Sequence, residues 1–527
     1  MKRNSKETPE EVYSKIQDLD YRKQYGQFFT PPEIGNFMSQ WILAIPKSDL
    51  KILDPAAGFG LFPRVMKSIK SKKSISYDLW EVDKNIAEEL ENITIFENIN
   101  ANVYNKDFLN SGWSKKYDGI IANPPYFKHH FLKNKIQLNK LFFEKTKHKF
   151  SLKTNIYCLF LIKSLKQLKI GGRLAFIIPS EFLNSNYGEH IKKFLLNSNL
   201  NLNFIGISFE ESVFDDATTT SVIVLAEKKS SKTEYINFYN ANNLSSLKSL
   251  KNFLSNNKKI QFHINEINTK TKWRNYFLEI RKPISKNLIK LSEFGKFKRG
   301  IATGANNFFT LNLEEINDLN LLKMNLIPCI TKSSHVEDTL FNKKQFEKLC
   351  KSNKKTYLFD GEKNENKFSK KYLKMGENLD IHLKYLTKNR SPWYSIEKRN
   401  ISKIWISVFS RDKLKIIWND TECLTLACFH TFYPTNLGKK YLKIIFLYLQ
   451  TDLAQKLLNL EKREYGNGLV KFEPNDLNKA LILDFRLLTK DQIKNLNSFH
   501  TKYIRQKDKK ERQTIITNAN QIFLSIN

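Results

Sequence analysis

The sequence predicts an α/β protein in which a doubly wound sheet of seven strands is followed by a mixed α+β region. Short apolar runs alternate with segments of helical periodicity up to residue 226, and a polar break follows at 228–232. Small residues form the turn after the first of these runs. We therefore predict a first domain over residues 1–232, a connecting segment over 233–280, a mixed domain over 281–485 and a C-terminal helical segment over 486–527.

Two of the predicted strands end in acidic residues. Residues 51–60 form an apolar strand with Asp54 at its end, then a turn of alanines and glycines that leads into a helix. Such a turn lets the backbone approach a ligand closely, and an acidic residue suits a cationic ligand better than a phosphate. The next strand ends at Glu81, where a carboxylate can bind both hydroxyls of a ribose.

The stretch Asn123-Pro124-Pro125-Tyr126 follows the short apolar run 117–122, which we interpret as a buried strand. Proline cannot continue a ladder, so the strand must end there, at the edge of the sheet where ligands bind. The side-chain oxygen of Asn123 and the carbonyl of Pro124 can accept hydrogen bonds from a nucleobase NH2 group. Two such acceptors would localise the nitrogen lone pair, and Tyr126 offers a face for base stacking.

Asn-Pro-Pro-Tyr after such a strand resembles the signature of S-adenosylmethionine-dependent amino-methyltransferases. The resemblance is closest to the gamma-class (Taq-type) adenine-N6 DNA methyltransferases of type II restriction-modification systems. It implies a Rossmann-like, seven-stranded domain that binds S-adenosyl-L-methionine, followed by a DNA target recognition domain. The implied reaction transfers a methyl group to the exocyclic N6 of an adenine that is flipped out of double-stranded DNA. The enzyme would be the modification enzyme of a restriction-modification system or an orphan methylase.

The resemblance also implies site residues. Catalysis is expected from Asn123, Pro124, Pro125 and Tyr126, and the target base is expected between Tyr126 and Phe214. Thr30 is expected to cap a helix that starts at Pro31 and to contact the cofactor. The expected cofactor-binding residues are Thr30, Asp54, Pro55, Ala56, Gly58, Gly60, Glu81, Val82, Asp107, Phe108 and Asn123.

Residues 294–309 form a basic stretch punctuated by glycines, which resembles the opening of the gamma-class target recognition domain. Lysine and arginine side chains can contact phosphates, and asparagine can read the edge of an adenine. The residues predicted to bind DNA are Lys296, Lys298, Arg299, Asn306 and Asn307.

The composition points to a polyanionic partner. The chain has 87 lysine and arginine residues against 53 aspartate and glutamate residues, a formal net charge of +34. Its five cysteines form no C-x-x-C pair, and the histidines lack metal-ligand spacing, so we expect a reducing cytoplasm and no metal site. We expect neither a signal peptide at the start of the chain nor a membrane span.

Double-stranded DNA is the expected partner, bound by a monomer, and a cognate restriction endonuclease would act without direct contact. A fused nuclease is not expected, because about 25 residues precede the cofactor motifs. Methylation of another amine remains an alternative, whether cytosine N4, ribosomal RNA adenine or protein glutamine. A non-catalytic DNA-binding protein is a further alternative, which the intact acidic residues and the Asn-Pro-Pro-Tyr stretch disfavour.

Overall fold

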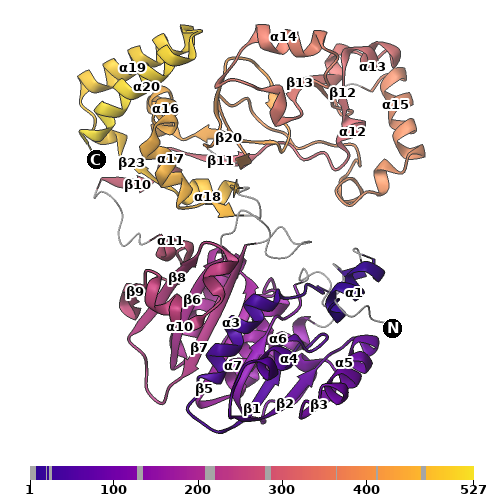
Figure 1. Ribbon diagram of the computed structural model, residues 1–527. Coiled ribbons are helices and arrows are strands. Elements are labelled where there is room, and N and C mark those ends of the chain that lie inside the picture. The colour runs from indigo at the N-terminus through magenta and orange to yellow at the C-terminus, as the bar shows by residue number, and fades with distance from the viewer. Residues whose placement is uncertain are drawn as a thin grey trace. The chain divides into compact units, whose positions relative to one another are not determined.

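The computed structural model of the 527-residue chain describes residues 7–18, 21–22, 26–126, 135–207, 220–278, 287–363, 365–410, 413–464 and 470–526. The chain divides into two compact units (Figure 1). Unit 1 comprises residues 1–281 with 464–468, and unit 2 comprises residues 282–463 with 469–527. Within the described residues, no helix is both long and apolar enough to cross a membrane.

Unit 1 is built on one sheet with the strand order β3-β2-β1-β4-β5-β7-β6-β8-β9. Its strands are, in that order, β3 (Ala101–Tyr104), β2 (Ser74–Trp80), β1 (Asp49–Asp54), β4 (Tyr117–Ala122), β5 (Leu168–Pro179), β7 (Ser221–Lys228), β6 (Leu200–Ile207), β8 (Tyr235–Ala241) and β9 (Ile260–His263). The first five strands pair in parallel, and β7 runs antiparallel to both β5 and β6. The predicted doubly wound sheet is thus confirmed.

The sheet contains two strands more than the predicted seven. Residues 233–280, expected to be a connecting segment, contribute β8 and β9 to it. Asparagines in this segment are typical of loops, but here their amides pair across strands. The Asn237 side chain donates to Asn203 Oδ1 at 2.9 Å and accepts from Gln261 Nε2 at 3.0 Å. This ladder satisfies polar groups that would otherwise be costly to bury.

Helices cover both faces of this sheet (Figure 1). The unit 1 helices are α1 (Pro9–Ile16), α3 (Pro32–Leu43), α4 (Leu61–Ser68), α5 (Lys84–Phe96), α6 (Lys135–Thr146), α7 (Ile156–Gln167), α8 (Glu181–Asn184), α9 (Gly188–Asn197), α10 (Leu250–Asn256) and α11 (Arg274–Phe277). Residues of α7, α9 and α11 pack in one hydrophobic core, and those of α3, α4 and α10 pack in another.

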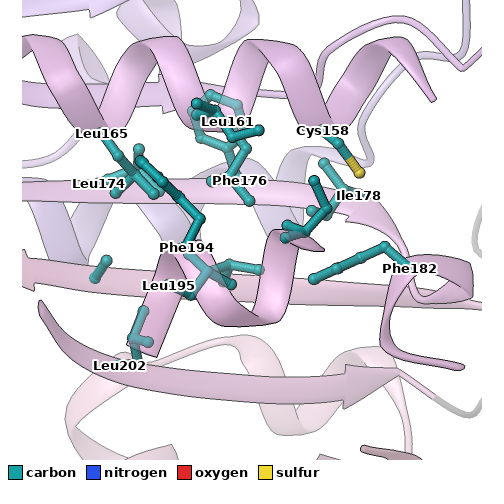
Figure 2. Packing of buried hydrophobic residues seen from close by; sticks show 14 of the residues in the cluster. Cys158, Leu161, Leu165, Leu174, Phe176, Ile178, Phe182, Phe194, Leu195 and Leu202 are labelled. Atoms are coloured by element: carbon teal, nitrogen blue, oxygen red, sulfur yellow. The ribbon is translucent and has the colours of Figure 1, made fainter. Parts of the chain in front are cut away.

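Apolar and polar residues do not alternate in the apolar run of β5, because its side chains pack on both faces of the sheet. Leu174, Phe176 and Ile178 belong to the core under α7 and α9, as Figure 2 shows, whereas Ala175 and Ile177 belong to the core on the opposite face. A central strand that is covered on both faces by helices needs apolar side chains on both of its sides.

Within its described residues, unit 2 contains four small sheets with the strand orders β10-β23, β11-β20-β16-β18-β14, β12-β15-β13-β19 and β17-β22-β21. Its strands are β10 (Leu288–Lys290), β11 (Gly295–Arg299), β12 (Thr310–Leu311), β13 (Leu326–Ile330), β14 (Leu340–Phe341), β15 (Tyr357–Phe359), β16 (Ile404–Ser407), β17 (Phe409–Ser410), β18 (Ile416–Asn419), β19 (Leu424–Thr425), β20 (Phe429–Pro434), β21 (Arg463–Glu464), β22 (Val470–Lys471) and β23 (Leu481–Leu483).

The helices of unit 2 are α12 (Asn306–Phe309), α13 (Leu313–Asp318), α14 (Lys343–Lys351), α15 (Lys367–Asn378), α16 (Asn436–Gln450), α17 (Asp452–Asn459), α18 (Pro474–Lys479), α19 (Lys490–Arg505) and α20 (Lys509–Leu524). The largest hydrophobic core of unit 2 joins α16, α19 and α20 to the sheet that contains β16 and β18. The mixed α+β character predicted for this half of the chain is confirmed.

Candidate active site

A cavity of about 530 Å³ lies in unit 1 where β1, β2 and β4 end. This is the edge at which open parallel sheets bind ligands, because the loops that leave neighbouring strands face each other there. Residues that follow each of these strands line the cavity, as do the loop before α3 and one side of α7. The lining residues include Gly26, Phe28, Phe29, Thr30, Pro55, Ala56, Gly58, Trp80, Glu81, Val82, Asp107, Phe108, Asn123, Pro125, Ile156 and Phe160.

The turn after β1 is fixed by two carboxylates. Asp54 Oδ1 accepts from the Ala56 N–H at 3.1 Å, and Glu81 accepts from the Gly58 N–H at 3.0 Å. Asp54 is 1% exposed, and its Oδ2 is buried with no hydrogen-bond partner among the residues that the structure describes. Burial, together with the neighbouring charge of Glu81, raises the pKa of Asp54 to about 8, and burial also raises the pKa of Glu81.

The two glycines of this turn adopt backbone conformations that other residues avoid. Gly58 has φ +53° and Gly60 has φ +72°, both in the left-handed region. A side chain at either position would be strained. The turn can therefore bring its backbone against a ligand without a side chain in between.

The wall beyond β2 and β3 is apolar and partly exposed. Val82 is 65% exposed and faces the cavity. Asp107 caps the short 3-10 helix η1 (Phe108–Asn110) by accepting from the Leu109 N–H at 2.8 Å, which fixes the position of Phe108. A flat apolar group would fit against Val82 and Phe108, with a carboxylate nearby to accept hydrogen bonds.

Asn123 stands immediately after β4, and its amide is held at both ends. Its Nδ2 donates to the backbone carbonyl of Phe28 at 2.8 Å, and its Oδ1 accepts from the hydroxyl of Tyr126. The Phe28 ring is stacked on Tyr126, with centroids 5.9 Å apart and planes inclined by 21°. One face of Tyr126 is thus already covered by an aromatic ring.

The loop before α3 packs tightly against the Asn123 turn. A Cβ atom added to Gly26 would lie 2.5 Å from the Tyr126 backbone nitrogen, and Gly26 has φ +66°. The helix begins at Pro32 with Pro31 at the N-cap position and no side-chain cap bond, so the predicted capping by Thr30 is wrong. A proline has no side-chain acceptor, and Thr30 instead lies one residue further out, on the cavity wall.

The predicted residues are not all in the lining. Asp54, Gly60, Pro124 and Tyr126 are not among the residues that line the cavity, although each neighbours one that does. Phe214 lies outside the described residues. The sequence analysis missed Trp80, Ile156 and Phe160, which also line the cavity. Ile156 and Phe160 lie four residues apart on α7, a spacing that does not distinguish a cavity wall from ordinary core.

The residues predicted to bind DNA lie in unit 2, on β11 and α12. Lys296 and Lys298 are exposed and share one face of β11, while Phe297 between them is buried. Arg299 is paired with Glu397 at 3.7 Å, and Lys298 lies 5.5 Å from the centre of the Tyr433 ring. Asn306 and Asn307 are exposed at the start of α12. Because β11 is the edge of its sheet, exposed lysines there also protect against edge-to-edge pairing.

The sheet order of unit 1 and the cavity beside its strand ends define a class I methyltransferase domain. Comparison with known families agrees: the model of the "N-6 DNA Methylase" family matches residues 16–286, about half of the chain. The model of the C-terminal domain of the type II methyltransferase M.Eco57I matches residues 270–523. The chain therefore belongs to the N-6 DNA methylase family.

Individual relatives support this assignment. The chain is 40% identical over 502 residues to the type II methyltransferase M.AccI of Acinetobacter calcoaceticus, a match that covers 92% of this chain and 91% of the relative. It is 28% identical over 346 residues to the type II methyltransferase M.HindII of Haemophilus influenzae, which covers 60% of each chain.

Two solved structures share the fold at low sequence identity. The type IIL restriction-modification enzyme MmeI, solved in complex with DNA, aligns with a TM-score of 0.66 at 11% identity, covering 98% of this chain and 78% of that one. The DrdV–DNA complex aligns with a TM-score of 0.57 at 12% identity, covering 94% of this chain and 58% of that one.

Proposed function

We propose that this chain transfers a methyl group from S-adenosyl-L-methionine to the N6 amine of an adenine in double-stranded DNA, as the modification enzyme of a restriction-modification system. The observation that carries this proposal is the convergence of Asp54, Glu81, Asp107 and Asn123. These side chains end or follow four strands and lie in or beside one cavity. The family, and relatives named type II methyltransferases, support the DNA substrate.

The cavity fits this cofactor in charge and shape. The buried Asp54 Oδ2 has no partner within the described parts of the chain, so a cationic ligand or its bound water would satisfy it. Glu81 would hold the ribose, and Val82, Asp107 and Phe108 would hold the adenine ring. Thr30, Pro55, Ala56, Gly58 and Gly60 would complete the site. When bound, the cofactor supplies a methyl group on a positively charged sulfur, so the acceptor amine needs no strong base.

Asn123 would orient and activate the acceptor amine. The hydrogen bond from its Nδ2 to the Phe28 carbonyl fixes which end of the amide is the acceptor. Oδ1 accepts at most one bond from the Tyr126 hydroxyl, whose single hydrogen can also go to the Ile177 carbonyl 2.9 Å away. A lone pair of Oδ1 therefore remains to accept a hydrogen from the target NH2 group. The Pro124 carbonyl would accept the other hydrogen, and Pro125 has no N–H to compete. Together they stabilise positive charge on the attacking nitrogen.

The amine is paired inside a duplex, so the adenine must leave the base stack to reach this site. We propose that it stacks on Tyr126, with Phe214 on its other side. Lys296, Lys298 and Arg299 would contact phosphates, and Asn306 or Asn307 would contact bases. We further propose that the protein acts as a monomer and that any cognate endonuclease recognises the same sequence without contacting it.

Sequencing of modified bases in DNA from cells that express the chain tests this function. We expect N6-methyladenine at one recurring sequence, and no modification when Asn123→Ala is expressed to the same level. N4-methylcytosine at a recurring sequence would assign the reaction to cytosine N4. Unmodified DNA, together with methylated RNA or protein, would assign it to another amine.

A further inference from the structure

A lysine with no place in the proposed reaction lies beside the cavity, fully buried. Lys163 is on α7 and is 0% exposed. Its ammonium group donates to the backbone carbonyl of Phe108, to the carbonyl of Ser111 at 2.8 Å and to the hydroxyl of Ser111 at 2.9 Å. The Leu109 carbonyl is 3.5 Å away. Three hydrogens thus meet acceptors that are all buried or partly buried.

These acceptors belong to the segment that forms one wall of the cavity. Residues 107–111 comprise Asp107, the turn η1 and Ser111, and both Asp107 and Phe108 line the cavity. Within this segment the Phe108 carbonyl accepts from the Ser111 N–H at 3.1 Å and from the Ser111 hydroxyl at 2.8 Å. Lys163 adds a further donor to it from an element 55 residues further along the chain.

Lys163 also contacts the Phe108 ring itself. Its Nζ lies 4.5 Å from the centre of that ring and 5.3 Å from the centre of the Trp113 ring. Phe160, one turn earlier on α7, packs on Phe108 with centroids 5.5 Å apart. Helix α7 therefore presses one aromatic side chain and one ammonium group against the Phe108 segment. Burial lowers the pKa of Lys163 to about 7, which the charge of Asp107 opposes.

We propose that Lys163 is a positioning residue for the cofactor: it holds the 107–111 segment in the conformation that binds the adenine nucleoside. This inference depends on the proposed function only in that S-adenosylmethionine occupies the cavity. Lys163 does not itself line the cavity. It therefore sets the affinity for the nucleoside and leaves the chemistry at Asn123 unchanged.

The chain contains a matched control in Lys192 on α9. Lys192 is 2% exposed, donates to the carbonyls of Leu183 at 3.0 Å and Thr271 at 2.8 Å, and lies 5.7 Å from the Trp273 ring centre. Burial lowers its pKa to about 7 as well. None of these partners lines the cavity. Replacement of Lys192 therefore lowers the stability of the fold, as the loss of any buried lysine would, but leaves the 107–111 segment unchanged.

The experiment compares Lys163→Met, Lys192→Met and Ser111→Ala with the full-length wild-type chain. Titration calorimetry gives Kd for S-adenosylmethionine and S-adenosylhomocysteine, steady-state kinetics give KM and kcat, and thermal unfolding gives Tm. We expect Lys163→Met to weaken both ligands about tenfold, equivalent to about 1.4 kcal/mol, with kcat at saturation within about twofold of wild type. Lys192→Met should lower Tm comparably and leave both Kd values within about twofold.

Ser111→Ala keeps the lysine and removes one of its acceptors, together with the hydrogen bond from the Ser111 hydroxyl to the Phe108 carbonyl, so it loosens the same segment in a milder variant. We expect it to weaken the binding of both ligands about threefold. It tests the inference if Lys163→Met does not fold. Unchanged Kd values in both variants at the Lys163 contact would overturn the inference, as would equal losses in Lys163→Met and Lys192→Met. A wild-type chain that binds neither ligand would instead overturn the cofactor assignment itself.

Discussion

The candidate sites of the two units are built in different ways. In unit 1, residues from four strand ends and from α7 converge on one cavity, although they are spread over more than a hundred positions of the chain. In unit 2, the predicted DNA-binding residues lie on one strand and one short helix, and their side chains are exposed. A catalytic site needs several side chains to meet in one place, and in unit 1 these side chains can be recognised in the sequence because they come at the ends of strands. Contacts with phosphates need only exposed positive charge.

This difference predicts unequal effects of substitution, and Asn123→Ala should have the largest. It removes an acceptor aimed at the reacting amine, so kcat should fall by about 10³-fold or more. Affinity for S-adenosylmethionine should stay within about threefold, since the carboxylates that would hold it are untouched. Methyl transfer from labelled cofactor and calorimetry measure the two quantities, and the exposed Asn199→Ala serves as a control. Activity near the wild-type level would remove Asn123 from the reaction.

The pH dependence of cofactor affinity should be the next largest effect. With a pKa of about 8, Asp54 is protonated in the empty site below that pH. A cationic ligand favours the ionised form, so binding releases a proton and Kd should decrease as pH rises from 6 to 8, by at most about tenfold per unit. Calorimetry in buffers of different ionisation enthalpy measures the proton release. Asp54→Asn should flatten the profile, and a flat wild-type profile would contradict the assignment.

The stability of the empty protein should respond to pH in the opposite direction. Because the pKa of Asp54 is raised on folding, the native state binds more protons than the unfolded state between pH 4 and 8. This contribution to stability is present at low pH and is lost as pH rises through about 8. Tm of Asp54→Asn should therefore depend less on pH in this window than Tm of the wild type.

Substitutions in unit 2 should have the smallest effects. Lys296→Ala combined with Lys298→Ala should weaken DNA binding a few-fold and reduce the slope of log K against log salt by about two, with no change in the methylated sequence. Fluorescence anisotropy at several salt concentrations measures the slope. The exposed pair Lys343→Ala and Lys344→Ala on α14 removes equal charge from another element. An equal change in both double variants would show that net charge, and not β11, sets the affinity.

Sequence reasoning succeeded where one local pattern carries both structure and chemistry. Glu81 and Asn123 each follow a strand directly, so the end of the strand and the position of the side chain were predicted together. It failed at β8, because Asn237 looks like a loop residue until its partners Asn203 and Gln261 are known. The predicted start of the helix after Thr30 was wrong by one residue, because either of two consecutive prolines can start a helix.

The sequence by itself determined the alternation of strands and helices up to residue 226 and the residues at the ends of β1, β2 and β4. These depend on short-range periodicity and on backbone rules for proline and glycine. Only the tertiary structure decided that Phe160 lines the cavity, that the Phe28 carbonyl orients the Asn123 amide and that Lys163 holds the Phe108 segment. Each of these contacts joins distant parts of the chain, and hydrogen-bond partners at such separations are set by the packing of whole elements.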